Sequence, residues 1–359
     1  MRDEVIDLIG RLVAIDSVNP ALVPGGAGEL EIARFVAGWA EQHALAADWL
    51  EATPGRPSVV VRKRERPPGP TLMLCAHLDT VGVEGMTDPH APRLEGDRLH
   101  GRGAYDMKSG LASALLACRE AEGDVIVAAV ADEEHASLGV QEVLAAYTAD
   151  AAIVTEPTEL ELIVAHKGFV WIEIEVEGRA AHGSRHEEGV DAIVKAGPVL
   201  TGIGVLDAAL AERTHPLLGR GSVHASLIEG GAEMSSYPGR CTIGLERRTL
   251  PGETQEQVEA EIERLLDGRG TLRTTLVREP FAVAEDAEIV RAVSAAAGDP
   301  KRSGAPYWAD AAFIAAAGIP TVMYGASGTG AHAVEEWVSV DDSVAVTRTL
   351  IDVARRLAA

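Results

Sequence analysis

The sequence predicts an α/β fold in which a domain with a mostly parallel sheet, flanked by helices, is interrupted by an inserted α+β domain. Short continuous apolar runs, typical of strands buried on both faces, indicate the sheet; they are TLMLCAH (71–77), DVIVAAVA (124–131), AAIVTE (151–156) and PTVMYG (320–325). Each run adjoins a helical stretch, which indicates an α/β layer fold with a largely parallel sheet. From about Gly168 the pattern becomes an alternation of apolar and acidic residues, which indicates a sheet with one solvated face.

Residue spacing predicts the elements around these strands. Residues 3–15 place Val5, Ile9 and Leu12 on one helical stripe, and residues 29–43 form a second amphipathic helix. Further helices are expected at 111–118, 137–147 and 310–318, a strand at 58–64, and a Pro- and Gly-rich turn at 64–70.

The inserted segment predicts its own small sheet. Its first strand, FVWIEIEVEG (169–178), alternates apolar residues with three glutamates, so one face is solvated. Two helices on one side of such a half-exposed antiparallel sheet form an α+β unit; the further strands are expected at 222–231, 242–250 and 271–279, and the helices at about 189–211 and 254–267. After about residue 277 the buried-strand pattern returns, and a helix containing Val346 and Leu350 ends the chain. The predicted segments are therefore 1–167, 168–277 and 278–359, with the first and third in one domain.

Composition excludes several classes of protein. The 359 residues carry 55 acidic and 32 basic side chains, a formal net charge of −23, which makes nucleic acid a poor partner. No stretch of about 18 uncharged apolar residues exists, so no membrane span is expected, and the acidic N-terminal segment does not resemble a signal peptide. Three widely spaced cysteines (Cys75, Cys118 and Cys241) indicate reduced, buried thiols and a cytoplasmic protein.

Polar residues follow the predicted buried strands, where they could bind a metal. In AHLDTV, His77 and Asp79 point to the same side of an extended chain, so His77 could bind a metal while Asp79 fixes its tautomer. The alternative is a merely polar strand end. In GRGAYDMKSG, glycines allow the unusual backbone needed to aim Asp106 inward; alternatively Asp106 caps the following helix. The glycine spacing matches no nucleotide-binding loop.

Three further segments carry candidate ligands. In ADEEHASLG, Glu133 and Glu134 follow a buried strand, where adjacent carboxylates are costly without a compensating cation; a solvated acidic loop is the alternative. Glu156 ends another buried strand in IVTEPT, and His332 lies in the loop GAHAVEEWV. Each of these two residues, taken alone, is more typical of a structural role.

The joint occurrence of these residues favours a metal centre. Open α/β sheets place active sites at the carboxyl ends of their strands, and several strands here end in carboxylate or imidazole ligands. Oxygen and imidazole ligands suit zinc, although cobalt and manganese accept the same ligand types. If one carboxylate bridges, the five ligands give each of two ions three protein ligands and leave room for water; the five are His77, Asp106, Glu134, Glu156 and His332.

In this order, the motifs AHLDTV, GRGAYDMKSG, DEE, EPT and GAH resemble the dizinc amidohydrolase and peptidase family. That family contains acetylornithine deacetylase, succinyl-diaminopimelate desuccinylase, aminoacylase and glutamate carboxypeptidase, and the resemblance covers nearly the whole chain. It implies two Zn²⁺ ions, one held by His77, Asp106 and Glu156, the other by His332, Asp106 and Glu134. The domain formed by 1–167 and 278–359 would be catalytic, and the insert would be a lid and dimerisation domain.

The resemblance also implies roles for residues that bind no metal. Glu133 would be the general base, Asp79 would orient His77, and a cis peptide bond would follow Asp106. In the insert, GRAAHGSRHEEGVDAI resembles the lid segment whose histidine, here His182, reaches the partner subunit's active site. LERRTLPGET resembles the motif that places Arg248 on a substrate carboxylate. Alternatives are an exposed turn histidine and a surface salt bridge.

This chain departs from the family pattern at some positions. Gly183 and His186–Glu187 replace the usual Ser and Pro after the lid histidine, AHLDTVGV lacks a Pro that many members have, and YGASGTGAH varies the usual Gly-rich loop. These changes concern loop shape and substrate choice, whereas the ligand set is intact.

The expected function is hydrolysis of the amide bond of an N-acyl amino acid, such as acetylornithine, by a homodimer. A metallocarboxypeptidase or dipeptidase with the same metals is the alternative within the family. A metal-bound regulatory protein without turnover would not need Glu133, and a nucleotide-binding enzyme is disfavoured by the missing phosphate loop.

Overall fold

The computed structural model describes residues 1–64 and 69–358, and the chain divides into two compact units. Unit 1 comprises residues 1–164, 283–303 and 309–359, and unit 2 comprises residues 165–282 and 304–308. The sequence predicted boundaries at 167/168 and 277/278, whereas the two units change over at 164/165 and 282/283. The sequence did not predict that residues 304–308 belong to unit 2. Residues 65–68 of the predicted turn at 64–70 lie outside the described residues.

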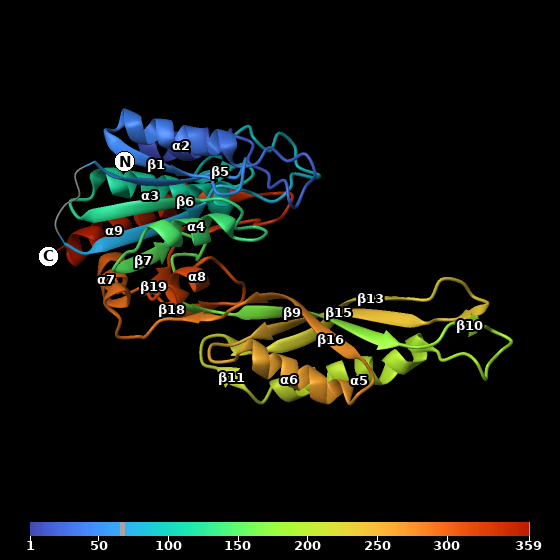
Figure 1. Ribbon diagram of the computed structural model, residues 1–359. Coiled ribbons are helices and arrows are strands. Elements are labelled where there is room, and N and C mark those ends of the chain that lie inside the picture. The colour runs from blue at the N-terminus through green and yellow to red at the C-terminus, as the bar shows by residue number, and fades with distance from the viewer. Residues whose placement is uncertain (65–68, 359) are drawn as a thin grey trace. The chain divides into compact units, whose positions relative to one another are not determined.

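Unit 1 is built on a large mixed sheet whose centre is parallel (Figure 1). The strand order is β1-β2-β6-β3-β7-β19-β8-β17, with β18 paired to β8. The four central strands β6, β3, β7 and β19 run parallel, whereas β1, β2, β8 and β17 join antiparallel at the sides. The strands are β1 (Leu45–Leu50), β2 (Ser58–Lys63), β3 (Thr71–His77), β6 (Asp124–Val130), β7 (Ala151–Val154), β8 (Leu162–His166), β17 (Phe281–Ala282), β18 (Arg302–Ala305) and β19 (Thr321–Met323). The predicted α/β class with a mostly parallel sheet is confirmed for this centre.

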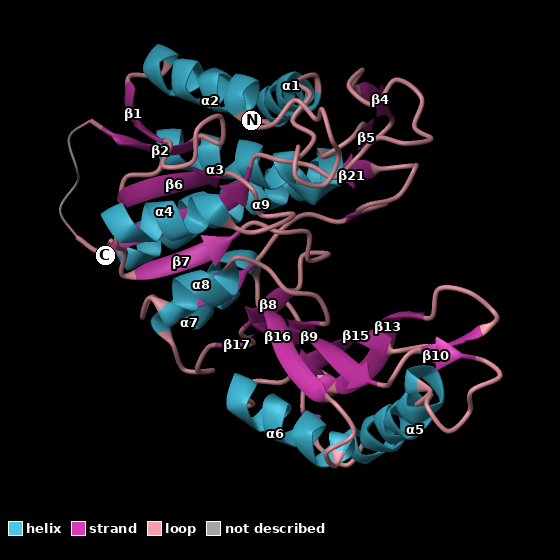
Figure 2. Ribbon diagram, turned by 45° about the vertical axis from the view of Figure 1, so that its right-hand side comes forward, coloured by secondary structure: helices cyan, strands magenta, loops and turns pink. Residues whose placement is uncertain are grey.

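Helices cover both faces of the sheet. Alternate strand residues such as Leu72, Leu74 and Val127 join one large core, which also holds apolar residues from α1, α2, α3, α7 and α9. The other face carries α4 and α8, which lie in front of the strands in Figure 2. The helices are α1 (Arg2–Val13), α2 (Leu30–Gln42), α3 (Ser109–Glu120), α4 (Leu138–Ala146), α7 (Glu288–Ala297), α8 (Ala311–Ala316) and α9 (Val340–Leu357). This layering buries every residue of β3, β6 and β7, as their continuous apolar sequences predict.

A second, small sheet of unit 1 was not predicted. It has the order β20-β21-β5-β4, and all its neighbours are antiparallel. Its strands are β4 (Arg93–Glu95), β5 (Arg98–His100), β20 (Gly328–Thr329) and β21 (Trp337–Ser339). Strands of two or three residues carry no readable alternation, which is why the sequence does not reveal them. The sheet matters because the β20–β21 connection contains His332.

Unit 2 has the predicted α+β architecture. Its antiparallel sheet has the order β13-β15-β9-β16, formed by β9 (Gly168–Glu177), β13 (Ser222–Gly230), β15 (Arg240–Thr249) and β16 (Thr271–Arg278). Apolar residues on one face of β9 and β15 pack with α5 (Ala192–Leu210) and α6 (Gln255–Leu266) in a separate core. Short pairs join β10 (Ala181–His182) to β14 (Ser236–Tyr237) and β11 (Thr214–His215) to β12 (Gly219–Arg220).

Two expectations about composition can be compared with the structure. Cys75, Cys118 and Cys241 are all free and buried, as predicted. Among the described residues, α5 is long and apolar enough to cross a membrane by length and composition alone, with a mean hydropathy of 1.5. It contains Lys195 and Asp207, and its buried side chains belong to the core of unit 2.

A close approach between α3 and the end of β7 gives a stability prediction. A Cβ atom at Gly110 would lie 2.2 Å from the Thr155 carbonyl oxygen, next to Glu156. We expect Gly110→Ala to lower the free energy of unfolding by about 1–3 kcal/mol, because the helix must move away from the sheet. Denaturant unfolding followed by circular dichroism measures this change. Gly204→Ala, in a helix with open space at that position, is the matched control and is expected to leave stability unchanged or raise it. Equal effects of the two substitutions would contradict the prediction.

Candidate metal centre and active site

The parallel strands bring the predicted ligands to one edge of the sheet. His77 is the last residue of β3, Glu133 and Glu134 follow β6, and Glu156 follows β7. Because β6, β3 and β7 are parallel neighbours, these residues emerge at the same edge. Asp106 comes from a kinked turn, η1 (Ala104–Lys108), in which its own backbone is not helical and which leads into α3.

Asp106 lies between two histidines and faces each with a different oxygen. His77 Nε2 is 3.1 Å from Asp106 Oδ1 and 3.9 Å from Glu156 Oε1. His332 Nε2 is 3.5 Å from Asp106 Oδ2 and 3.0 Å from Glu134 Oε2. The structure thus brings together two triads that share Asp106, and each has the composition that the family resemblance implies.

The electrostatics of this cluster show an excess of buried negative charge. Burial raises the pKa of Glu156 to about 8, although His77 opposes the shift. Burial, helped by the charge of Glu156, also raises the pKa of Glu133 well above its usual range. Hydrogen bonds from His332 and His77 overcome burial and hold the pKa of Asp106 well below its ordinary value. Hydrogen bonds to Asp106 and Glu134 raise the pKa of His332 to about 10.

The residues present fit a pair of divalent cations. Glu134 Oε1 is buried and accepts no hydrogen bond within the described part of the chain. Because buried polar atoms normally have a partner, this oxygen is a candidate ligand for a cation. Carboxylate oxygens and imidazole nitrogens within 4.8 Å of one another form two possible metal-binding groups, His77–Asp106–Glu134 and His77–Glu133–Glu156. Both groups contain His77, so they are alternatives around one histidine; the second triad rests on the contacts of His332 with Asp106 and Glu134. Such donors suit zinc and similar divalent ions. A solvated acidic loop, the alternative for Glu133 and Glu134, does not describe this buried arrangement.

The backbone around Asp106 has the unusual geometry that its glycines suggest. Gly103 has a φ of 78°, and the peptide bond between Asp106 and Met107 is cis, as the resemblance implies. The Asp106 side chain does not cap α3, which has no side-chain cap. Its carboxylate is aimed at the two histidines instead.

Asp79 contacts His77 through its main chain. His77 Nδ1 lies 2.9 Å from the Asp79 carbonyl oxygen and 3.8 Å from the carboxylate. A carbonyl oxygen can only accept, so Nδ1 donates and Nε2 is left available to a cation. The Asp79 carboxylate instead accepts the N–H groups of Glu133 and Glu134, at 3.1 and 3.2 Å. It therefore fixes the turn that carries those two glutamates.

A buried polar network behind this turn escaped the sequence analysis. Asn19 Nδ2 donates to the carboxylates of Asp79 and Asp132, at 2.7 and 3.0 Å. Arg56 pairs with Asp132 and with Glu29, both at 2.6 Å. The acidic run at 132–134 was the only signal in the sequence, because Asn19, Glu29 and Arg56 lie more than 75 residues away from it.

The other two predicted residues belong to unit 2. His182 lies on β10 and is exposed, with its Nδ1 2.8 Å from Ser184 Oγ. Arg248 on β15 is partly exposed; it donates from Nε to Glu246 at 2.7 Å and lies over the Phe169 ring. Its neighbour Arg247 is buried and pairs with glutamates of unit 2. Arg248 is therefore the accessible guanidinium of the two, and its role and that of His182 stay predictions.

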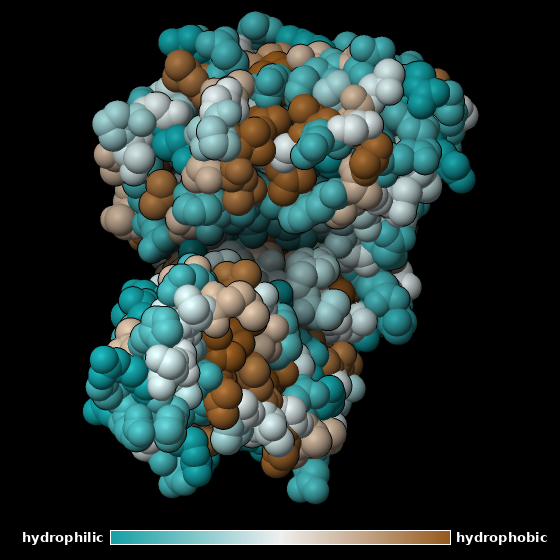
Figure 3. Space-filling model, turned by 90° about the vertical axis from the view of Figure 1, so that its right-hand side faces the viewer, coloured by the Kyte–Doolittle hydropathy of each residue, from teal (hydrophilic) through white to brown (hydrophobic). Residues whose placement is uncertain are grey.

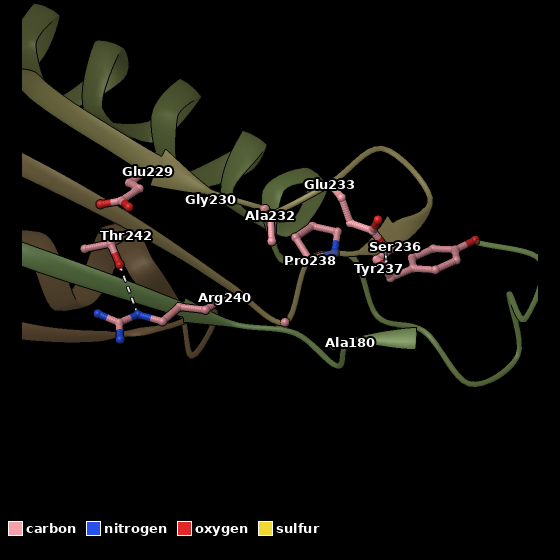
Figure 4. A pocket seen from close by; sticks show the side chains of 12 residues that line it. Ala180, Glu229, Gly230, Ala232, Glu233, Ser236, Tyr237, Pro238, Arg240 and Thr242 are labelled. Carbon is pink, nitrogen blue, oxygen red and sulfur yellow. Dashed lines mark hydrogen bonds between the residues drawn. The ribbon is translucent and has the colours of Figure 1, made fainter. Parts of the chain in front are cut away.

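A hollow of about 740 Å³ lies beside the β10–β14 pair (Figure 4). Its lining includes Glu229, Glu233, Tyr237 and Arg240. Figure 4 shows that these side chains do not converge on one point, and that Arg240 turns to Thr242, to which it donates at 3.1 Å. The hollow therefore lacks the convergent polar groups of a ligand site.

The fold and the clustered ligands define a class of hydrolase that works with bound divalent cations. A carboxylate shared between two histidine-containing triads can hold two divalent ions, which activate water, and a half-buried glutamate beside it, Glu133, can move a proton. Residues 73–356 match the model of Peptidase family M20/M25/M40, and the chain belongs to that family. It is an enzyme that hydrolyses amide or peptide bonds.

Curated relatives carry different acyl groups in their names. An acetylornithine deacetylase of Myxococcus xanthus is 31% identical over 76% of each chain. An N-formyl-4-amino-5-aminomethyl-2-methylpyrimidine deformylase of Bacillus subtilis is 27% identical and covers 98% of this chain and 94% of its own. A succinyl-diaminopimelate desuccinylase of Nitratiruptor is 28% identical over 94% and 96%.

Solved structures share the fold over the whole chain. A tripeptidase from Staphylococcus aureus superposes with a TM-score of 0.81 at 18% identity, over 100% of this chain and 99% of its own. The YXEP protein of Bacillus subtilis, described as a dinuclear metal-binding peptidase of the M20 family, has a TM-score of 0.73 at 17% identity, over 99% and 98%. At these identities the likeness concerns the fold.

The network behind Glu133 and Glu134 gives a prediction for Asn19. Asn19→Asp replaces the donor between Asp79 and Asp132 by a third carboxylate, so each of these two buried carboxylates loses one donor and gains a like charge beside it. We expect a loss of about 1–3 kcal/mol or more in unfolding free energy, larger than for Asn19→Ala, which adds no charge. Thermal unfolding of the two variants and the wild type measures the difference. If Asn19→Asp is as stable as the wild type, the network does not brace the turn.

Proposed function

We propose that this protein is a two-metal hydrolase that removes the acyl group, most simply acetyl, from an N-acyl amino acid such as acetylornithine. One observation carries the proposal: Asp106 presents separate oxygens to His77 and His332, while the Glu133 carboxylate lies in the same cluster, within 4.8 Å of ligand atoms of His77 and Glu156. The acetylornithine deacetylase relative supports the choice of acyl group.

The two triads would hold the ions. His77, Asp106 and Glu156 would hold one, and His332, Asp106 and Glu134 the other, and we propose zinc for both because its preferred donors are present. Cobalt and manganese accept the same donors and could replace it. Divalent ions bound there supply Lewis acidity, which lowers the pKa of water toward about 7.

Glu133 is the proposed general base. Its carboxylate would take a proton from the attacking water and deliver it to the nitrogen of the leaving amine. Burial, which raises its pKa, suits a group that must both accept and return a proton near neutral pH. The turn that Asp79 fixes through the N–H group of Glu133 keeps this side chain in place.

Unit 2 would supply substrate contacts. We propose that Arg248 binds the substrate carboxylate with its guanidinium, since Arg247 is committed to internal ion pairs. His182 would polarise the scissile carbonyl of a substrate bound in the partner subunit. The free, buried cysteines support a proposed cytoplasmic location.

Replacement of Glu133 tests the mechanism. We expect Glu133→Gln to lower kcat by about 10²–10⁴-fold on N-acetyl amino acids, because the amide cannot accept the proton, while the metal content of the purified protein stays the same. Turnover of a panel of N-acetyl amino acids and dipeptides, with metal analysis, measures both. Wild-type preference for dipeptides would favour the alternative, a metallocarboxypeptidase or dipeptidase. Full activity in the variant, or a wild type that holds no metal, would refute the mechanism.

The proposed homodimer forms through unit 2. Strand β13 is the edge of its sheet, and residues 224–230 are exposed along it, including Leu227 and Ile228, at 74% and 55%. Val194 and Val205 on α5 are also exposed, and Figure 3 shows apolar side chains gathered on one face of unit 2. An exposed edge strand that carries Leu227 and Ile228 favours pairing with a second copy of the chain.

Leu227→Glu is expected to convert the dimer to a monomer, because it places a charge in the middle of the proposed strand pairing. Light scattering after gel filtration measures the mass in solution. Leu94→Glu is the matched control, since Leu94 is an exposed leucine on β4, the edge of the small sheet in unit 1. A wild-type monomer, or a Leu227→Glu dimer, would contradict the proposed interface.

A further inference from the structure

His332 is a proposed ligand that, like Asp106 on η1, does not follow a strand of the large sheet. It lies in the β20–β21 connection with a φ of 59°, and 57% of its side chain is exposed. The side chains of His77, Glu134 and Glu156, in contrast, are almost wholly buried and follow strands of the large sheet. Something else must therefore keep His332 at a constant distance from Asp106.

A buried ion pair links the two loops that carry these ligands. Arg102 and Glu336 are 2.6 Å apart, with side chains 4% and 0% exposed. Arg102 also donates from Nη2 to the carbonyl oxygen of Ala333, the residue after His332, at 2.9 Å, and from Nε to Gly82 O at 3.1 Å. The guanidinium thus donates hydrogen bonds to two residues of the loop of His332, Ala333 and Glu336.

Glu336 holds the other loop. Its Oε1 accepts the N–H groups of Tyr105 and Asp106, at 2.9 and 3.1 Å, and its Oε2 accepts that of Gly103 at 3.0 Å. The main-chain carbonyl of Glu336 accepts the N–H group of Gly101 at 3.2 Å. One carboxylate therefore fixes the peptide groups that lead into the shared ligand Asp106.

The free-energy cost of burying this ion pair indicates that it does more than fill space in the core. Two buried charges are often no more stabilising than apolar side chains of similar size, yet they give a directed geometry that apolar packing cannot give. Among the described residues, every hydrogen bond that the Glu336 carboxylate accepts comes from Arg102 or from the loop that ends at Asp106. Two of the three described groups that accept from Arg102 lie in the loop after His332.

We propose that Arg102 and Glu336 are positioning residues for the second metal site. They set the separation of Asp106 and His332, and with it the affinity for the ion at His332, without contacting that ion. The inference rests on the proposed two-metal function. It assigns the effect to one site, because His77 and Glu156, the other proposed ligands of the first site, lie at the ends of strands β3 and β7 of the large sheet and not in the loop of His332.

The test is a cobalt titration of the metal-free protein, followed by visible absorption and by equilibrium dialysis. His332→Ala serves as the reference that removes the second site. In Glu336→Gln the amide nitrogen must face either Arg102 or backbone N–H groups, so one donor meets another donor. We expect the affinity of the second cobalt ion to fall about 10–100-fold, and the affinity of the ion that His332→Ala retains to change less than about threefold.

Two further variants separate positioning from a general loss of stability. Arg102→Lys keeps the charge but has one nitrogen where three contacts are made, so it is expected to weaken the same ion. Glu261→Gln alters a buried carboxylate paired with Arg247 in unit 2, and it is expected to bind both ions as the wild type does. Glu336→Gln added to His332→Ala is expected to leave the remaining ion's affinity unchanged.

The outcomes distinguish the inference from the function on which it rests. A wild type that binds no cobalt would overturn the two-metal function. A wild type that binds two ions, with Glu336→Gln and Arg102→Lys binding both equally well, would overturn the positioning role alone. Equal weakening of both ions in Glu336→Gln would also overturn it, because a general structural defect does not choose one site.

Discussion

The crowding of negative charge at one buried sheet edge is the constraint on which the rest of unit 1 depends. Four carboxylates meet there, and their mutual repulsion and burial raise the pKa of most of them. Only positive charge makes such a cluster tolerable in a folded protein. Histidines supply some of it, and bound cations would supply the rest. Stability and chemistry are therefore linked, since the groups that would be costly without an ion are those that would hold it.

Different hydrogen-bonding groups around the cluster orient different ligands. The main-chain carbonyl of Asp79 orients His77, and its carboxylate holds the turn of Glu133 and Glu134. Side chains of Asn19 and Arg56 in turn hold Asp79 and Asp132. His77, Glu134 and Asp106 therefore each have a supporting partner that does not itself bind a cation, a pattern common at metal sites. Buried charged pairs outside the ligands are part of the site in this sense.

The sequence predicted what depends on local pattern. Continuous apolar runs located the parallel strands, alternation located β9, and the ligands followed because strand ends share an edge. The edge strand β1 was missed because LAADWL (45–50) neither alternates clearly nor forms an apolar run. Arg56 and Glu336 were missed because their partners lie far away in the chain, and no spacing rule connects them. Long-range polar contacts have no periodic signature.

The spread of the ligands along the chain has a consequence for biosynthesis. His77, Asp106, Glu134 and Glu156 leave the ribosome early, whereas His332 follows only after the whole of unit 2 has been made. A nascent or prematurely terminated chain that stops before residue 332 carries one complete triad and only part of the other. Such a chain has the donors for a single ion. The second ion can therefore be bound only after translation has passed unit 2 and reached the strands of the small sheet that flank His332.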